Sequence, residues 1–396
     1  MTESRPTVRP ILYLPNLAAY RDRASLFGQV IRDAGGEGAL VTSRLDVDPS
    51  TLGLDDINLV LAPPRWRAPG RSMFGASRTV ASLLREGDYN VVHDTFGHLI
   101  PVMLRKKRYP GTKFVTSLYL LPEWDLRSWY WPRYHLGFLK YKNLRSLIMR
   151  SLTQRALARL ADAVVVQAPG LVDRFVEKPG IDRSRVDWIP NNISDPRESP
   201  IHAPAADSPI TLLFVGGFSV VKGGDKVLSL LGQARSAGID LRLRVLGGIS
   251  PVDRAHIESR IRNENLQDLV NIQQRVPENQ VGEAYASADW LFHVTESDGS
   301  PRVVLEALIR GLPVIGSHHP GVRVVDPDEQ FILFSDPWEP DAVLEILTSA
   351  RSEPLPYRQR SEAGQEYVRG NFSVEAVAPR YVELYSRLLS NWEGHV

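Results

Sequence analysis

The strongest constraint on the fold is the regular alternation of strand-like and helix-like segments in the second half of the chain. Short apolar runs, typical of strands buried on both faces, are separated by short loops and by segments with helical spacing of apolar residues. The predicted strands are 212–215, 241–246, 270–272, 289–294, 313–315 and 331–334. This pattern is typical of a parallel sheet covered by helices on both faces, and such sheets bind ligands at the carboxyl ends of their strands.

The first half of the chain repeats this alternation less regularly. The predicted strands are 11–14, 39–42, 57–61, 91–92, 114–115, 163–167 and 186–190. Helices are predicted over 17–34 and 78–85, so the chain opens as a βαβ unit. Both halves are therefore predicted to be α/β.

The length and a change in composition predict the domain organisation. A chain of 396 residues is too long for one ordinary core, so two domains are expected. Residues 195–209 are rich in Pro, Ala, Ser and Asp and lack apolar periodicity, which predicts a linker with a boundary near residue 205. The predicted domains are 1–205 and 206–372, followed by a helical segment, 373–396, with apolar residues at helical spacing.

The composition excludes several kinds of site. The chain has no cysteine, which excludes disulfides, thiolate metal sites and a cysteine nucleophile. Its net charge of +1 gives no bias toward nucleic acid. The first ten residues lack the apolar core of a signal peptide, and no run approaches the ~20 apolar residues of a membrane span. We therefore expect a cytoplasmic protein that is soluble or at most peripheral to a membrane.

A glycine-rich turn follows the predicted strand that ends at residue 215. Gly216 and Gly217 open the turn, and Lys222 comes shortly after them. Glycines let the backbone approach an anion closely, and a lysine can place its charge on that anion. The spacing matches neither a P-loop nor a dinucleotide-binding fingerprint, so the turn alone is a weak indication of phosphate binding.

A second strand, turn and helix occupy residues 291–311. Ser300 is predicted as the N-cap of the helix and Pro301 as its first residue. The N–H groups of residues 299–303 would then be available to bind phosphate. Asp298 lies in the turn itself.

Glu306 interrupts the apolar residues of this predicted helix. Burying a lone carboxylate is costly, so Glu306 needs a partner or a ligand. One interpretation is an intrahelical salt bridge, because Arg302 and Arg310 lie four residues before and after it. The other is contact with a ligand.

The two turns together resemble the pattern of a large family of retaining glycosyltransferases with the GT-B fold, called group 1 or family 4. That pattern runs G-R-x4-K-G, then E-x7-E, then G-x-P-V, and the corresponding residues here are 216–223, 298–306 and 311–314. The resemblance covers roughly residues 208–389, and the first half matches in outline. The chain departs from the pattern at Gly217, which replaces an arginine, and at Asp298, which replaces a glutamate.

This resemblance implies two Rossmann-like domains that face each other across a cleft, with a C-terminal helix that crosses back to the N-terminal domain. The first domain would bind the acceptor and the second the nucleotide sugar. The implied activity moves a hexosyl or related sugar from a UDP-, GDP- or dTDP-linked donor to a hydroxyl of a glycan, lipid-linked or small-molecule acceptor. The family retains the anomeric configuration, and no cofactor or metal is expected.

The resemblance also implies roles for individual residues. Lys222, Asp298 and Glu306 would form the catalytic centre, with Asp298 near the sugar ring and Glu306 accepting hydrogen bonds from the ribose. Lys222 and backbone N–H groups would neutralise charge on the leaving diphosphate without a metal. The two Asp-x-Asp sequences, 46–48 and 326–328, are interpreted as turns. The predicted donor-binding residues are Gly216, Gly217, Lys222, Gly247, Arg275, Asp298, Gly299, Ser300, Pro301, Arg302, Val303 and Glu306.

Acceptor contacts are predicted at Asn16 and His93, because both follow predicted strands of the first domain. Residues 121–159 interleave basic and aromatic side chains, which suits a peripheral contact with the inner membrane face or an anionic acceptor. The alternative is a solvated helix whose aromatic side chains lie in the core.

Two other functions stay open. A nucleotide-sugar epimerase or a glycoside phosphorylase with this fold would use the same phosphate pocket. A degenerate, non-catalytic transferase subunit would have the same fold without the activity. Release of nucleoside diphosphate only in the presence of acceptor would indicate transfer.

Overall fold

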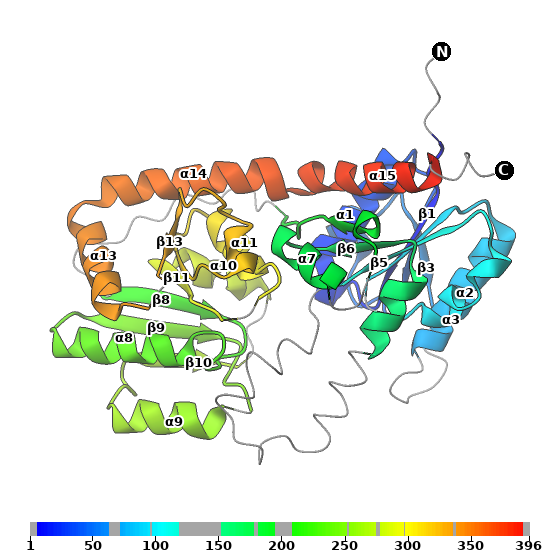
Figure 1. The fold of residues 1–396 in the computed structure, drawn as a ribbon. Helices are drawn as coiled ribbons and strands as arrows, with labels where there is room; N and C mark the ends of the chain where they lie inside the picture. Colours follow the sequence, from blue (N-terminus) through cyan, green and yellow to red (C-terminus); the bar gives the residue numbers. More distant parts are fainter. Residues whose placement is uncertain are drawn as a thin grey trace. The chain divides into compact units, whose positions relative to one another are not determined.

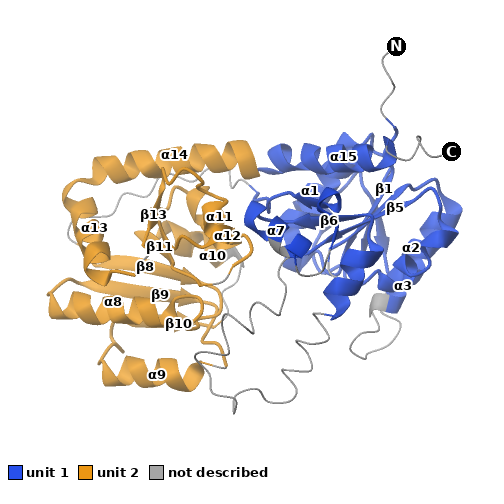
Figure 2. Cartoon of the chain, in the orientation of Figure 1, with its two compact units in different colours: residues 1–194, 373–396 blue, residues 195–372 orange. Residues whose placement is uncertain are grey.

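The computed structural model describes residues 6–62, 72–95, 97–118, 152–177, 181–194, 208–251, 253–274, 278–296, 298–335 and 338–390. The chain divides into two compact units (Figure 2). Unit 1 comprises residues 1–194 and 373–396, and unit 2 comprises residues 195–372. The division falls at the start of the segment that the composition predicts as a linker.

Unit 1 is built on a seven-stranded parallel sheet in the order β3-β2-β1-β4-β5-β6-β7. Its strands are β1 (Pro10–Leu14), β2 (Ala39–Thr42), β3 (Asn58–Leu61), β4 (Val91–Asp94), β5 (Lys113–Ser117), β6 (Ala163–Val166) and β7 (Val186–Trp188). Its helices include α1 (Arg21–Asp33), α2 (Ser72–Glu86), α3 (Ile100–Met103), α7 (Pro169–Glu177) and α15 (Val374–Ser390) (Figure 1).

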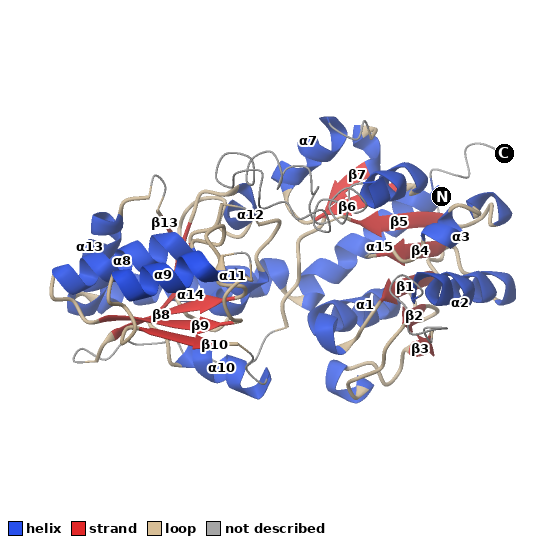
Figure 3. Cartoon of the chain, turned by 90° about the horizontal axis from the view of Figure 1, so that it is seen from below, coloured by secondary structure: helices blue, strands red, loops and turns tan. Residues whose placement is uncertain are grey.

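Unit 2 is built on a six-stranded parallel sheet in the order β10-β9-β8-β11-β12-β13. Its strands are β8 (Ile210–Val215), β9 (Leu241–Leu246), β10 (Val270–Gln273), β11 (Trp290–His293), β12 (Val314–Gly316) and β13 (Ile332–Phe334). Its helices include α8 (Gly224–Ser236), α9 (Arg254–Asn263), α10 (Glu278–Ala286), α11 (Arg302–Leu308), α12 (Pro320–Arg323), α13 (Pro340–Ser352) and α14 (Pro354–Phe372). Strands in each unit run side by side between helices (Figure 3).

The predicted α/β architecture is confirmed, because both sheets are parallel and their connections carry helices. Strands 39–42 and 241–246 have the predicted bounds. The predicted helix over 17–34 is shorter than expected: a 3₁₀ turn occupies Ala18–Tyr20, and α1 begins only at Arg21.

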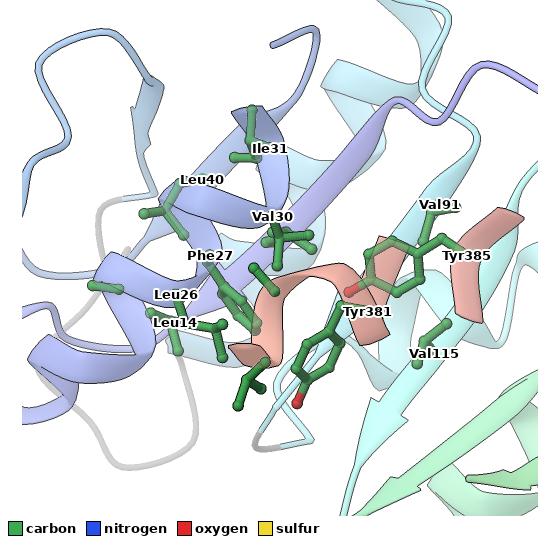
Figure 4. Close-up of a cluster of buried hydrophobic side chains, with 14 of the residues drawn as sticks. Leu14, Leu26, Phe27, Val30, Ile31, Leu40, Val91, Val115, Tyr381 and Tyr385 are labelled. Atoms are coloured by element: carbon green, nitrogen blue, oxygen red, sulfur yellow. The ribbon is translucent and has the colours of Figure 1, made fainter. Parts of the chain in front are cut away.

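The C-terminal helix α15 returns to unit 1, as predicted. Tyr381 and Tyr385 enter the core beside Phe27 of α1 (Figure 4). The buried Arg23 guanidinium donates from Nη1 to the Tyr381 hydroxyl over 2.7 Å and from Nη2 to Asn191 Oδ1 over 2.9 Å. These charge-assisted hydrogen bonds satisfy a cation that would otherwise be costly to bury, and they fix α15 against α1.

Candidate functional site

The strand order of unit 2 singles out one point on its sheet. From β8 the chain proceeds outward to β9 and β10, and it then returns to β11 on the other side of β8. In a parallel sheet, loops that leave two such neighbouring strands diverge to opposite faces and open a crevice at the strands' carboxyl ends. The two loops here are residues 216–223 after β8 and residues 294–301 after β11, which are the two turns that the sequence singles out.

Glycines hold the first of these loops in place. Gly216 has φ +113° and donates its N–H to Leu246 O over 2.7 Å. Gly247, with φ +130°, packs directly on the carbonyl of Gly216, where a Cβ atom would collide with the backbone. Gly223 has φ +94°, and a Cβ there would lie 2.6 Å from Val294 O. These glycines therefore let the loop after β8 lie against β9 and against the end of β11.

The two loops enclose a pocket of about 200 Å³ within unit 2. The β8 side contributes Val215, Gly216, Gly217 and Lys222. The β11 side contributes His293, Asp298, Pro301, Arg302 and Val303. Seven of the twelve predicted donor-binding residues thus line one pocket, and two of them are cations.

The pocket holds a short ion pair. Lys222 Nζ donates to Asp298 Oδ2 over 2.6 Å, and His293 Nε2 lies 3.5 Å from the same oxygen. Burial alone would raise the pKa of Asp298, but the contact with His293 and the charge of Lys222 outweigh it and hold that pKa well below its usual range. Asp298 is therefore a carboxylate at neutral pH.

His293 is a pocket residue that the sequence analysis did not identify. It is the last residue of β11, and its side chain is only 6% exposed. Its one signal in the sequence is a histidine within an otherwise apolar strand, between Phe292 and Val294.

Glu306 does not line the pocket, and it has two partners. Arg302 Nη2 lies 3.4 Å from Glu306 Oε1, so the predicted salt bridge to Arg302 is confirmed. Tyr285 of α10 donates its hydroxyl to Glu306 Oε2 over 2.8 Å. Arg310 instead donates to the backbone carbonyl of Glu306 over 2.9 Å, and its guanidinium lies 5.1 Å from the Tyr285 ring centroid. Of the two arginines at helical spacing, Arg302 therefore contacts the carboxylate, whereas Arg310 contacts the peptide oxygen and the aromatic face.

The predicted start of the helix after the second loop is also wrong. Pro301 has extended backbone (φ −73°, ψ 108°) and is itself the N-cap, so α11 begins at Arg302 and not at Pro301, and it ends at Leu308, before Gly311. With only seven helical residues, α11 has a short dipole. The cations Lys222 and Arg302, rather than a helix terminus, therefore supply the positive charge of the pocket.

Three further predicted donor residues lie beside the pocket without lining it. Gly299 and Ser300 connect Asp298 to Pro301, and Gly247 supports the carbonyl of Gly216 from β9. Arg275 lies outside the described residues.

The structure corrects the prediction for His93 in unit 1. His93 lies within β4, not in a turn, and its side chain is fully buried. Nδ1 lies 2.6 Å from the Tyr385 hydroxyl and Nε2 lies 2.8 Å from Ser117 Oγ. Burial, with a smaller effect of the Arg23 charge, lowers the pKa of His93 to about 3. Because both ring nitrogens are already bonded inside the core, we assign His93 a structural role.

Asn16 is partly buried after β1 and shapes the local turn. Its Nδ2 donates to Asp46 Oδ2 over 2.8 Å, and its Oδ1 accepts from Ala19 N over 2.8 Å. Its predicted contact with an acceptor stays a prediction. The segment predicted to meet a membrane, 121–159, lies largely outside the described residues, which resume at Leu152.

The two Asp-x-Asp sequences, 46–48 and 326–328, lie in turns, as the sequence indicates. Asp48 caps the 3₁₀ turn Pro49–Leu52, and Asp326 is fully buried and accepts three backbone N–H groups. Within the described ranges, no group of three His, Asp or Glu side chains is arranged to hold a metal ion. No helix among the described residues is both long and apolar enough to cross a membrane.

The chain contains two doubly wound parallel sheets, and in each the direction of the connections reverses at a central strand. Solved structures share this fold over nearly the whole chain. Sucrose-phosphate synthase from Thermosynechococcus elongatus superposes with a TM-score of 0.71 at 18% identity and covers 97% of this chain and 100% of that chain. The Anabaena protein HepE, in complex with UDP and glucose, has a TM-score of 0.68 at 12% identity and covers 96% of this chain and 99% of that chain. The chain thus has the GT-B fold.

Family models match both halves of the chain. Residues 23–192 match the glycosyl transferase 4-like domain, and residues 197–367 match the glycosyl transferases group 1. The chain therefore belongs to the group 1 glycosyltransferase family. Mannosylfructose-phosphate synthase of Agrobacterium fabrum is 24% identical over 248 residues, which cover 57% of this chain and 53% of that protein. The chain spans about half, or less, of the length of the curated relatives it matches.

Proposed function

We propose that the protein transfers a hexosyl or related sugar from a nucleotide-diphosphate sugar to a hydroxyl acceptor, and that the pocket of unit 2 binds the donor's diphosphate. The observation that carries the proposal is the pairing of Lys222 and Arg302 on one pocket of about 200 Å³ whose other wall is the glycine-rich loop. Pockets that enclose whole ligands usually measure about 300–1,000 Å³. A pocket of this size suits the diphosphate and its immediate surroundings.

The chemistry of such a transfer explains why two cations belong there. As the bond from the sugar to the diphosphate breaks, negative charge grows on the phosphate oxygens, and fixed positive charge stabilises that transition state. Lys222 and Arg302 place an ammonium, with three donors, and a guanidinium, with five, on this pocket, and both groups bind phosphate oxygens in proteins. We propose on this basis that the transfer needs no metal ion.

We propose distinct roles for the two carboxylates. Asp298 lies in the pocket, and its charge is maintained by Lys222 and His293. It would contact the sugar ring, where a carboxylate can accept hydrogen bonds from hydroxyls. Glu306 lies beside the pocket, held by Tyr285 and Arg302, and it would accept hydrogen bonds from the ribose. Retention of anomeric configuration is part of the same proposal and rests on the family.

The similar fold of HepE supports a nucleotide-sugar donor for this chain, because that protein has been solved with UDP and glucose. The donor base is tested directly by thermal unfolding with UDP, GDP or dTDP, since a ligand that binds only the native state raises the melting temperature. We expect one of the three to raise it. Acceptors in the proposal are glycans, lipid-linked sugars or small glycosides.

The test has a matched control. Lys222→Met should abolish the nucleotide-induced rise in melting temperature. Lys106→Met should preserve it, because Lys106 forms a comparable ion pair with Asp162 in unit 1, at 3.2 Å and similar exposure. If none of the three diphosphates stabilises the native protein, the proposal is wrong. Release of nucleoside diphosphate that depends on an added acceptor would separate transfer from epimerisation or phosphorolysis.

A further inference from the structure

His293 has a fixed position at the wall of the pocket in unit 2. It is the last residue of β11, which lies between β8 and β12 in the sheet, and it pairs with Gly316 of β12. Its side chain lines the pocket and is otherwise buried. Because buried side chains are closely packed, a short side chain on a central strand has little room to move.

The Nε2 atom of His293 is buried, and within the described part of the chain it makes no hydrogen bond. Asp298 Oδ2 lies 3.5 Å from this nitrogen, whereas charge-assisted hydrogen bonds measure about 2.7–2.9 Å. A carboxylate can only accept, so a hydrogen bond between the two groups requires the proton on Nε2. Buried polar atoms are usually bonded, so this nitrogen indicates a contact that the site forms in another state.

Lys222 donates to the same oxygen of Asp298, over 2.6 Å. It lies in the loop after β8, its side chain is 34% exposed, and a lysine carries its charge on a flexible four-carbon stem. The two groups that face Asp298 Oδ2 therefore differ in freedom. Lys222 can turn to a ligand in the pocket, whereas His293 is confined beside the carboxylate.

A diphosphate in this pocket would attract the ammonium of Lys222 away from Asp298. The Asp298 side chain is only 19% exposed, and a mostly buried carboxylate that loses its partner is unfavourable. It would also repel the phosphate. A shift of less than about 1 Å would bring Nε2–H of His293 within hydrogen-bond distance of Oδ2 and restore a partner to the carboxylate.

Other side chains at the pocket are less suited to this replacement. Among the described residues that line it, the side chains with N–H donors are Lys222, His293 and Arg302. Arg302 lies 3.4 Å from Glu306, a carboxylate on its own helix. His293 is thus the replacement partner that the geometry provides.

We infer that His293 is a positioning residue that takes over Asp298 when Lys222 turns to the diphosphate. Nε2–H of His293 then donates to Asp298 Oδ2 and keeps this carboxylate charged and oriented. The inference rests on the proposed function, because it deepens the role of the donor pocket. It follows that His293 affects the affinity for the diphosphate through Asp298, without touching the ligand.

The first test measures binding of UDP, GDP and dTDP to the full chain by titration calorimetry. His293→Met removes the donor and should weaken binding about tenfold, as expected for the loss of one hydrogen bond to a charged group. His293→Gln places an amide N–H near the position of Nε2 and should bind within about threefold of the native protein. His256→Met is the control, because His256 of α9 lies 2.8 Å from Asp225, outside the pocket, and it should not change the affinity.

The variant Asp298→Asn separates an effect through Asp298 from a direct contact with phosphate. A neutral asparagine needs no replacement for Lys222, so in this background His293→Met should weaken binding by less than about twofold. The same tenfold loss in both backgrounds would mean that His293 contacts the ligand itself, which would overturn the inference.

NMR of the native chain with ring-¹⁵N-labelled histidine follows the exchange without relying on any variant to fold. We expect saturating nucleoside diphosphate to shift the Nε2 proton of His293 downfield, as its hydrogen bond to the carboxylate forms, and to leave His256 unchanged. His293→Gln identifies the signal. An unchanged His293 signal, or native affinity in His293→Met, would contradict this inference alone. If none of the three diphosphates binds, the donor proposal is wrong and the inference fails with it.

Discussion

Replacing Arg302 by alanine tests whether this side chain serves the diphosphate or only its salt bridge. Arg302 lines the pocket, and hydrogen bonds to charged groups contribute about 1.5–3 kcal/mol each. Removing one such bond from the transition state corresponds to about a 10- to 150-fold loss in kcat/KM. We therefore expect Arg302→Ala to lower kcat/KM by more than about tenfold. The assay is the release of nucleoside diphosphate in the presence of acceptor.

The effect of the same change on stability should be small. The Arg302 side chain is 39% exposed, and its 3.4 Å contact with Glu306 is an i,i+4 pair on a short helix. Such pairs contribute about 0–1 kcal/mol. Arg358 forms the same kind of i,i+4 pair with Glu362 on α14, away from the pocket. Arg358→Ala is thus the matched control, and it should leave kcat/KM unchanged.

An arginine at position 217 should restore part of the activity that Arg302→Ala loses. Gly217 stands where the family pattern has an arginine, it lines the pocket, and a Cβ atom built there meets nothing within 4 Å. Its backbone also lacks the positive φ that confines Gly216 to glycine. Gly217→Arg, added to Arg302→Ala, should therefore restore part of the lost activity. Near-normal activity of Arg302→Ala, or a loss equal to that of Arg358→Ala, would refute the reasoning.

Four further outcomes are expected. Transfer should persist in EDTA, and complete loss that magnesium or manganese restores would contradict a metal-independent site. The pKa of Asp298 is lower in the folded than in the unfolded chain, so its charge stabilises the fold above about pH 4 and loses that effect below it. In urea unfolding, the difference in unfolding free energy between the native protein and Asp298→Asn should therefore shrink below about pH 4. His93 has a folded pKa of about 3 against 6.5. Stability should therefore rise with pH between those values, by up to about 1.4 kcal/mol per pH unit, and His93→Gln should lack this contribution. Gly247→Ala should push its Cβ into the carbonyl of Gly216 and so weaken nucleotide binding more than it lowers the melting temperature.

The sequence by itself determined the elements and the two loops that form the pocket. Residues 11–14, Ile-Leu-Tyr-Leu, form an uninterrupted apolar run, and such a run is stable inside a sheet that is covered on both faces; β1 is indeed buried along its whole length. The glycines at 216 and 223 and the lysine between them could also be interpreted locally, because a positive φ favours glycine and a lysine beside a glycine-rich turn can place its charge on an anion. Fold class and pocket location could therefore be predicted.

Only the tertiary structure decided what individual side chains do. His93 and His98 lie five residues apart around one turn, yet the first is bonded inside the core by α15 and the second is held at the strand ends by β1. Likewise, Glu306 is bonded by Tyr285 of another helix, and His293 joins the pocket from inside a strand. The physical reason is that hydrogen bonding and charge depend on groups far apart in the chain, whose proximity arises only when the sheets and helices pack.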